Sequence, residues 1–307
     1  MRLIIDTDPG IDDALALLYL AAQPGVEIAA VGSVHGNAPA PRTAANARRV
    51  LDEAGLRDVP VAVGAHRPLA QPLRTSEFVH GDDGLGGEGG DVDVTRGESA
   101  AEQLVRLARA NPGRFTLLAL GPLTNVALAL LLEPDLPDLL DAVVVMGGAI
   151  RVPGNRTAHA EANVHLDPEA ADLVLGAGFR LTLVGLDVTE AVRVDSAWID
   201  ALNASPAPVA RFSAAALRYY VDFYTKALGY RTFTPHDPLA AAILLDPTLA
   251  TYDHLAVGVE LTGTHTRGRT VADLRGNRAE GTGHRIAVAR TVDTARFHSG
   301  LLAALTR

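Results

Sequence analysis

Four aspartates lie within eight positions near the amino terminus, in the segment 6–13, which reads DTDPGIDD. Carboxylates crowded in this way repel one another unless a positive charge compensates them. Pro9 and Gly10 turn the chain, so that two acids end an extended segment and two open a helix, whose dipole favours negative charge. Oxygen ligands that converge from a strand end and a helix start suit Ca²⁺ or Mg²⁺. Helix capping by Asp12 and Asp13 alone would explain one or two of these acids and not all four.

Short β-branched or leucine-rich runs alternate with longer alanine- and leucine-rich stretches along the chain. The short runs predict strands that are buried on both faces, and the longer stretches predict helices between them. The predicted strands are 3–6, 28–34, 115–120, 142–146 and 181–184, and the predicted helices are 12–22, 41–54, 100–110, 124–132 and 168–175. This order is typical of an α/β protein with a doubly wound, mostly parallel sheet and helices on both faces. Ligands of such sheets bind at the carboxyl ends of the strands, where the acidic segment lies.

The whole chain, 1–307, is predicted to form a single large domain, because no repeat or low-complexity linker marks a boundary. A helical insertion is expected over about 195–230, and its last aromatic residues could form a lid. The segments 257–262 and 285–289 and a final helix from Thr294 are expected to add an edge to the same unit.

Composition excludes several classes of protein. A net charge of −9 disfavours a nucleic-acid partner. The chain contains no cysteine, which excludes disulfides, a thiol nucleophile and thiolate zinc sites. The apolar run at residues 1–5 is too short for a signal peptide, and no apolar stretch reaches the roughly 18 residues that cross a bilayer. A soluble, cytoplasmic protein that binds neither nucleic acid nor membrane is therefore expected.

The acidic segment and its neighbours resemble the inosine-uridine nucleoside hydrolases, whose amino-terminal fingerprint is DxDxGxDDA. Further segments typical of that family follow in family order across nearly the whole chain, and most of them come directly after a predicted strand. They are 34–37 (VHGN), 119–125 (ALGPLTN), 145–148 (VMGG), Asn155, 161–163 (EAN), 167–171 (DPEAA) and 236–238 (HDP). The resemblance implies a calcium-dependent ribonucleoside N-ribohydrolase, which uses water to cleave the bond between ribose and a nucleobase.

The resemblance also implies roles for single residues. The ligands of Ca²⁺ would be Asp8, Asp13, Asp237 and the backbone carbonyl of Leu120, joined by the ribose 2′- and 3′-hydroxyls and one water. Asp8 would in addition act as general base toward the calcium-activated water, which attacks the anomeric carbon through a transition state with oxocarbenium character. His236, beside a metal ligand, is the expected proton donor to the leaving base, with a tyrosine as the alternative. The residues expected to contact the substrate are Asp12, Asn37, His80, Met146, Asn155, Glu161 and Asn163.

One position departs from the pattern of many purine-accepting relatives, which carry an aromatic residue between the Glu and Asn that bind the sugar. Here that position is Ala162, so the sequence leaves the preferred base open. Four aromatic residues of the following region could supply a substitute ring: Tyr220, Tyr224, Tyr230 and Phe233. Relatives assemble as dimers or tetramers, so a homo-oligomer is expected.

Other functions fit the sequence less well. The segment 84–89 spells G-x-G-x-x-G, but no strand leads into it and nearby acids would repel a pyrophosphate, so we interpret it as a lid loop. An aspartyl phosphotransferase would need a basic residue beside its metal, and the only lysine, Lys226, lies in the helical insertion. Two nearer alternatives stay open, namely a hydrolase of another N-ribosyl compound and a calcium-stabilised protein that binds ribosyl compounds without cleaving them.

Overall fold

The computed structural model describes residues 1–91, 97–275 and 284–307, and within them a nine-stranded mixed sheet forms the centre of one α/β domain. The strands lie in the order β3-β2-β1-β4-β5-β6-β9-β7-β8. Their bounds are β1 (Arg2–Thr7), β2 (Glu27–Ser33), β3 (Val61–Val63), β4 (Thr116–Ala119), β5 (Ala142–Met146), β6 (Leu181–Val184), β7 (Ala250–Val259), β8 (Thr270–Ala272) and β9 (Arg285–Val292). Neighbours from β3 to β9 pair in parallel, whereas β7 runs antiparallel to both β9 and β8. The predicted doubly wound sheet is confirmed.

The helices connect these strands and begin and end close to the predicted positions. They are α1 (Ile11–Ala21), α2 (Ala40–Glu53), α3 (Glu77–His80), α4 (Ala100–Ala110), α5 (Thr124–Leu132), α6 (Leu136–Leu139), α7 (Ala162–Leu166), α8 (Pro168–Leu175), α9 (Leu186–Thr189), α10 (Ser196–Ala204), α11 (Pro208–Leu228), α12 (His236–Leu245) and α13 (Thr294–Leu305), with 3₁₀ turns η1 (Glu190–Val192) and η2 (Pro247–Leu249). The bounds of α4, α5 and α8 agree with the prediction. The helices of four or five residues escape prediction because one turn carries no periodicity.

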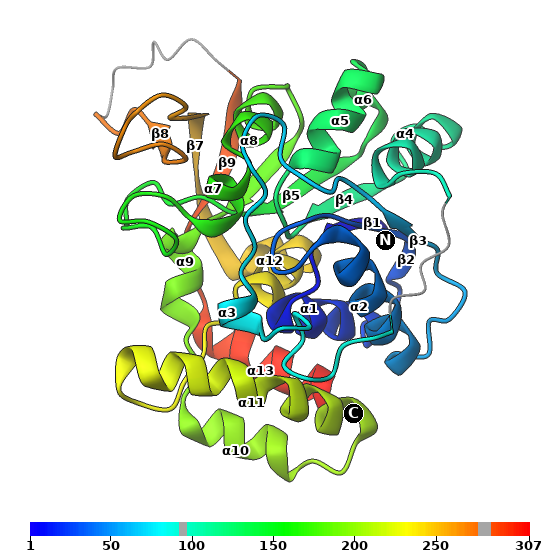
Figure 1. Ribbon diagram of the computed structural model, residues 1–307, viewed down its shortest axis with the longest axis vertical. Coiled ribbons are helices and arrows are strands. Elements are labelled where there is room, and N and C mark those ends of the chain that lie inside the picture. The colour runs from blue at the N-terminus through cyan, green and yellow to red at the C-terminus, as the bar shows by residue number, and fades with distance from the viewer. Residues whose placement is uncertain (92–96, 276–283) are drawn as a thin grey trace.

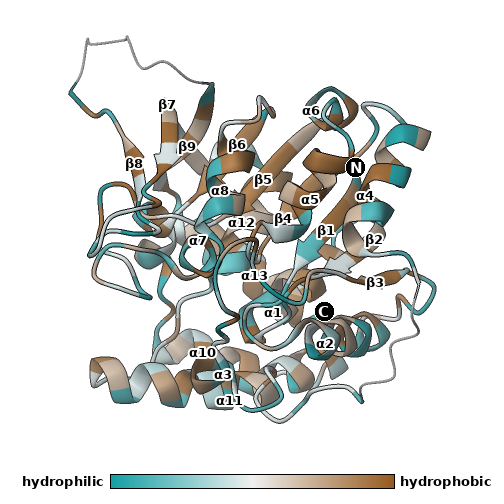
Figure 2. Cartoon of the chain, turned by 45° about the horizontal axis from the view of Figure 1, so that its top comes forward, coloured by the Kyte–Doolittle hydropathy of each residue, from teal (hydrophilic) through white to brown (hydrophobic). Residues whose placement is uncertain are grey.

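Helices cover both faces of the sheet (Figure 1). Along β1, Leu3 and Ile5 pack into the layer that contains α1, α12 and α13, whereas Ile4 packs into the opposite layer with α4 and α5. Successive residues of a strand point to opposite faces, so a continuous apolar run gives a strand that is buried on both. Figure 2 shows this pattern as hydrophobic strands inside helices whose outer surfaces are hydrophilic.

The predicted helical insertion consists of α10 and α11, which lie outside α1 and α13 (Figure 1). Asp195 caps α10 by accepting a hydrogen bond from the backbone N–H of Trp198 at 2.9 Å. Gly229, with a φ of 83°, ends α11 in the left-handed conformation that glycine adopts without strain. None of the described helices is long and apolar enough to cross a membrane.

Candidate active site

A cavity of about 340 Å³ lies between the carboxyl ends of the central strands and α11. The residues predicted to contact substrate all line it: Asp12, Asn37, His80, Met146, Asn155, Glu161 and Asn163. Leu120, His236 and Asp237 line it as well. Asp8 and Asp13 are both fully buried beneath the cavity and do not line it. Asp13 belongs to the acidic cluster that forms the floor, and Asp8 lies beside that cluster. The fold therefore brings together in space segments that lie far apart in the sequence.

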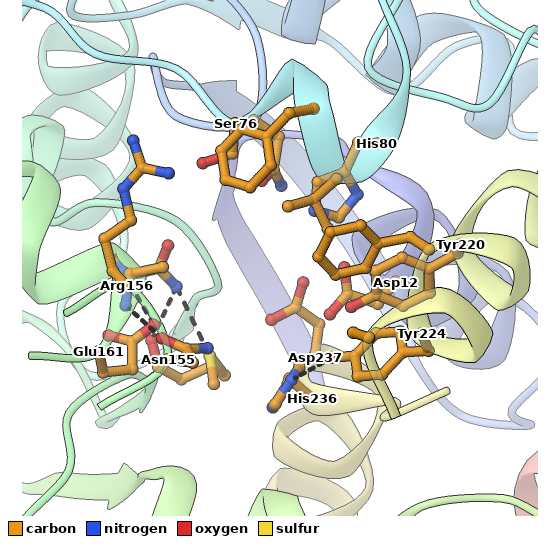
Figure 3. Close-up of a pocket in the computed structure, with 18 of the residues that line it drawn as sticks. Asp12, Ser76, His80, Asn155, Arg156, Glu161, Tyr220, Tyr224, His236 and Asp237 are labelled. Carbon is orange, nitrogen blue, oxygen red and sulfur yellow. Dashed lines mark hydrogen bonds between the residues drawn. The ribbon is translucent and has the colours of Figure 1, made fainter. Parts of the chain in front are cut away.

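The floor of the cavity is a cluster of buried acids. Carboxylate oxygens of Asp12, Asp13 and Asp237 lie within 4.8 Å of one another, and Figure 3 shows Asp12 and Asp237 beside each other in the cavity. Burial raises the pKa of Asp12 to about 8, and the charge of Asp13 adds to this effect. Burial, and after it the negative charges of Asp13, Asp12 and Asp8, raise the pKa of Asp237 well above its usual range. Within 1–91, 97–275 and 284–307 no arginine or lysine forms an ion pair with these acids, so the cluster would be stabilised by a cation.

Asp8 is enclosed by backbone on two sides. Its Oδ2 accepts a hydrogen bond from the backbone N–H of Asn37 at 2.7 Å, and its buried Oδ1 has no partner in the described part of the chain. A Cβ atom at Gly36 would come within 3.0 Å of Oδ2, and one at Gly121 would come within 3.0 Å of Oδ1. The two glycines thus let the chain close around a carboxylate that keeps one oxygen free for a ligand.

Asp13 and the carbonyl of Leu120 are also held in place. The Asp13 carboxylate accepts hydrogen bonds from the Thr7 hydroxyl, from the backbone N–H of Gly10 at 3.0 Å and from Asn37 Nδ2 at 3.0 Å. Asn163 Nδ2 donates to the Leu120 carbonyl at 2.6 Å. These donors fix an oxygen-only set of carboxylates and a carbonyl, which is the ligand chemistry of a hard divalent cation.

The wall formed by residues 155–163 carries polar groups that are fixed by the backbone. Glu161 caps α7, and its carboxylate accepts hydrogen bonds from the backbone N–H groups of Gly148, Asn163 and Val164 at 3.0, 2.8 and 3.0 Å. Asn155 Oδ1 accepts from the backbone N–H of Ala162 at 2.9 Å. Asn155 and Glu161 lie across the cavity from the aromatic residues of α11 (Figure 3). This wall offers the paired donors and acceptors that recognise sugar hydroxyls.

A histidine and a tyrosine are paired at the opposite wall. The hydroxyl of Tyr224 lies 3.2 Å from Nε2 of His236, whose Nδ1 lies 2.8 Å from the Thr189 hydroxyl. Burial lowers the pKa of His236 to about 3, with the charge of Arg193 adding to this effect, and burial raises the pKa of Tyr224 to about 12. At neutral pH the imidazole is therefore uncharged and the phenol keeps its proton.

His80 and the aromatic rings complete the cavity. Nδ1 of His80 accepts a hydrogen bond from the backbone N–H of Ile11 at 3.1 Å, and its ring stacks on Tyr220 at 5.2 Å between centroids. Of the four rings considered as substitutes at Ala162, Tyr220 and Tyr224 line the cavity. Tyr230 does not line it and is 54% exposed, and Phe233 is fully buried in the core.

Several residues that line the cavity were not among the predicted site residues: Ser76, Phe78, Val79, Arg156, Glu190, Phe223, Ala227 and Leu228. Phe78 of α3 meets Phe223 of α11 with their ring centroids 6.3 Å apart, and the guanidinium carbon of Arg156 lies 5.1 Å from the centroid of the Phe78 ring. Two of the missed residues had a detectable signal, because Arg156 directly follows Asn155 and Glu190 follows the carboxyl end of β6 by six residues.

The loop that spells G-x-G-x-x-G is organised by its own acid. The carboxylate of Asp83 accepts hydrogen bonds from the backbone N–H groups of Leu85, Gly87 and Gly89 at 2.9, 3.1 and 2.8 Å. A pyrophosphate would need such N–H groups for itself. The geometry thus argues against dinucleotide binding here, and residues 84–89, interpreted above as a lid loop, do not line the cavity.

A layer of buried polar residues lies behind the site. Asn125 Nδ2 donates to Asp6 Oδ1 at 2.7 Å and to the Ser33 carbonyl at 2.8 Å, and burial raises the pKa of Asp6 to about 7. The Thr124 hydroxyl lies 3.1 Å from Nε2 of His35 and donates to Asp167 at 2.6 Å. These residues of the GPLTN and DPEAA segments tie strand ends together, and they do not line the cavity.

His35 of this layer makes folding sensitive to acid. Burial lowers its pKa from 6.5 to about 4. Between these values the unfolded chain binds a proton that the folded chain does not, so the free energy of unfolding falls as the pH falls. We expect His35→Gln to lack this acid-dependent loss of unfolding free energy, which amounts to at most roughly 3 kcal/mol at pH 4. Urea unfolding of both proteins between pH 7 and 4 measures it, and parallel pH profiles would contradict the prediction.

Comparisons with known proteins agree with this geometry. The sequence profile of the inosine-uridine preferring nucleoside hydrolases matches residues 3–299. The chain is 34% identical to the inosine-uridine preferring nucleoside hydrolase of Crithidia fasciculata over 310 residues, which cover 100% of this chain and 98% of that protein. A plant nucleoside hydrolase of known structure superposes on the chain with a TM-score of 0.95 at 33% sequence identity. The superposition covers 99% of this chain and 98% of the plant protein. The structure of a purine-preferring ribonucleoside hydrolase from Gardnerella vaginalis superposes with a TM-score of 0.92 at 30% sequence identity, covering 100% of this chain and 98% of that protein.

Proposed function

Because the chain belongs to the inosine-uridine preferring nucleoside hydrolase family, whose members hydrolyse ribonucleosides to ribose and free base, we propose that it does so with a Ca²⁺ ion at the acidic floor of the cavity. The observation that carries the proposal is the cluster of buried carboxylates, with no ion-paired cation in the described ranges, next to the free Oδ1 of Asp8. Oxygen ligands in this number suit calcium.

Asp8, Asp13, Asp237 and the carbonyl of Leu120 would hold the ion, and Asp12 lies close enough to them to share in binding the ribose. When bound, the ion would lower the pKa of a water molecule and grip the ribose 2′- and 3′-hydroxyls. Asp8 is enclosed beside this floor and takes the proton from the attacking water as general base. The carboxylates of the floor stabilise the electron-poor anomeric carbon in the transition state.

The remaining polar residues orient the ribose. Glu161 and Asn155 face the sugar from one wall, and backbone N–H groups fix their orientation before substrate binds. Asn163 and Asn37 each hold a proposed calcium ligand while they line the cavity, so they couple the position of the sugar to that of the acids. Groups that are fixed in advance lose less entropy when the substrate binds.

His236 and Tyr224 protonate the leaving base in this proposal, since their hydrogen bond places an exchangeable proton at the aromatic end of the cavity. We expect His236→Ala to lower kcat/KM for inosine and uridine by about 10²- to 10⁴-fold. Nitrophenyl riboside, whose leaving group departs without a proton, should lose less than about tenfold. Equal losses on both kinds of substrate would show that His236 holds the site together and does not protonate the base. Tyr224→Phe tests the tyrosine in the same assay.

The experiment that tests the proposed function is release of free base from a panel of purine and pyrimidine ribonucleosides, with and without a calcium chelator. Hydrolysis that stops on chelation and returns with Ca²⁺ supports the proposal. Calcium binding without hydrolysis of any ribonucleoside would favour a binding protein, and cleavage of a different N-ribosyl compound would move the substrate class. We further propose that the protein is cytoplasmic and forms a homo-oligomer, either a dimer or a tetramer. Light scattering after gel filtration measures the mass of this oligomer.

A further inference from the structure

The acidic floor determines how a ribose lies in the cavity. If the 2′- and 3′-hydroxyls meet the acids, the substituents at C1′ and C4′ must point to opposite ends, because these carbons flank the ring oxygen. One end is formed by the wall with Asn155 and Arg156, and the other contains His236 and Tyr224 (Figure 3). Since the base leaves at the end that donates a proton, the C5′ hydroxymethyl group faces Asn155.

Glu190 is a charged side chain at the base end. It begins η1, directly after the Thr189 whose hydroxyl contacts His236, and it lines the cavity. Burial is the main cause of the raised pKa of the Tyr224 phenol, and the charge of Glu190 adds to this effect. Ala227 and Leu228 line the cavity at the C-terminal end of α11. A planar base in this end would thus meet one carboxylate beside apolar side chains.

The carboxylate of Glu190 is held in place through one oxygen, while the other oxygen remains able to accept a hydrogen bond. Oε2 forms an ion pair with Arg193 of the same turn, and the Glu190 side chain is 31% exposed. Oε1 has no hydrogen-bond partner within the described ranges. An ion-paired carboxylate accepts hydrogen bonds and donates none, so the oxygen that remains can only recognise a donor.

Building on the proposed function, we propose that Glu190 determines base specificity by accepting the ring N–H of lactam bases. Hypoxanthine and guanine carry this donor at N1, and uracil carries it at N3. Adenine and cytosine have an unprotonated ring nitrogen at the equivalent position, whose lone pair would face the carboxylate and repel it. Binding these bases would place the lone pair of an acceptor against a carboxylate oxygen, which costs more than a missing contact.

Two matched pairs of substrates test this assignment, inosine against adenosine and uridine against cytidine, because each pair differs at the lactam edge. The wild-type enzyme should prefer the lactam member of both pairs. In Glu190→Gln the amide can present either its oxygen or its N–H₂ group, so we expect both kcat/KM ratios to fall by about 10- to 100-fold. N1-methylinosine, which lacks the N–H, should be a poor substrate of the unaltered enzyme.

Glu98→Gln is the control variant, since it makes the same chemical change in a glutamate that is ion-paired to Arg106 on the surface, outside the cavity. It should leave both ratios unchanged. Unaltered ratios in Glu190→Gln, an equal fall for all four nucleosides, or efficient hydrolysis of N1-methylinosine would each overturn the role of Glu190. If the wild-type enzyme hydrolyses none of these nucleosides, the proposed function itself fails, which is a different and distinguishable result.

Discussion

Asp8→Asn is expected to lower kcat/KM for ribonucleoside hydrolysis by at least about 10³-fold, because it removes a general base and a charge that holds the cation. The change keeps the shape of a side chain that two glycines enclose, so the protein should fold. The N–H of Asn37 can still donate to the amide oxygen of the new side chain. Steady-state kinetics at saturating Ca²⁺, together with the calcium dissociation constant from calorimetry, separates the loss of the base from the loss of the ligand.

Asp141→Asn is the matched control, since Asp141 is an exposed acid that pairs with Arg180 far from the cavity. It should change neither activity nor calcium affinity. Activity of Asp8→Asn within tenfold of the wild-type enzyme would contradict the role of Asp8, and another acid of the floor would then have to accept the proton.

Gly36→Ala and Gly121→Ala are expected to have the second largest effect. Each added Cβ would come within 3.0 Å of one carboxylate oxygen of Asp8. Neither glycine has a positive φ, so alanine fits the backbone. The clash with Asp8 is the cause of the effect at Gly36, and at Gly121 it is joined by a clash with the Val34 side chain. Displacing a catalytic group by a fraction of an ångström to one ångström can cost about 10²-fold in rate. Both variants should therefore bind calcium more weakly and lose activity.

Gly300→Ala is the control for these substitutions. Gly300 lies within α13, and an added Cβ there would meet nothing within 4 Å. Alanine stabilises a helix relative to glycine, so this variant should unfold at the same or a slightly higher temperature with unchanged kinetics. Wild-type activity in Gly36→Ala and Gly121→Ala would show that Asp8 has room to move and that its enclosure is not needed.

Much of the fold could be predicted because its signals are local. Alanine- and leucine-rich periodicity gave α4, α5 and α8, and continuous apolar runs gave β5 and β6 with the observed bounds. The three-residue strands β3 and β8 were missed, since three residues carry too little pattern. The antiparallel pairing of β7 with β9 depends on contacts between segments that no local pattern connects.

The residues of the candidate site likewise include some that the sequence could predict and others that it could not. Residues at or shortly after the carboxyl end of a strand line the cavity, as expected for ligand sites in sheets of this kind. Met146 ends β5, and Asn37 lies in the loop after β2. Glu190 and Phe223 reach it only through the packing of η1 and α11 against the strand ends, which sequence spacing does not reveal. The sequence also grouped Asp6 with the other acids, but Asp6 hydrogen-bonds Asn125 behind the site and is not part of the cluster of Asp12, Asp13 and Asp237.

In the proposed mechanism, a calcium ion at the acidic floor binds the ribose hydroxyls, so hydrolysis depends on both the ion and these hydroxyls. The most direct measurement is a calcium titration of the chelator-treated enzyme, with hydrolysis of a ribonucleoside and of its 2′-deoxy counterpart followed in parallel. We expect activity on the ribonucleoside to return with one calcium per chain, whereas the 2′-deoxynucleoside stays uncleaved at every calcium concentration. Full activity without calcium, or equal cleavage of the two substrates, would contradict this mechanism.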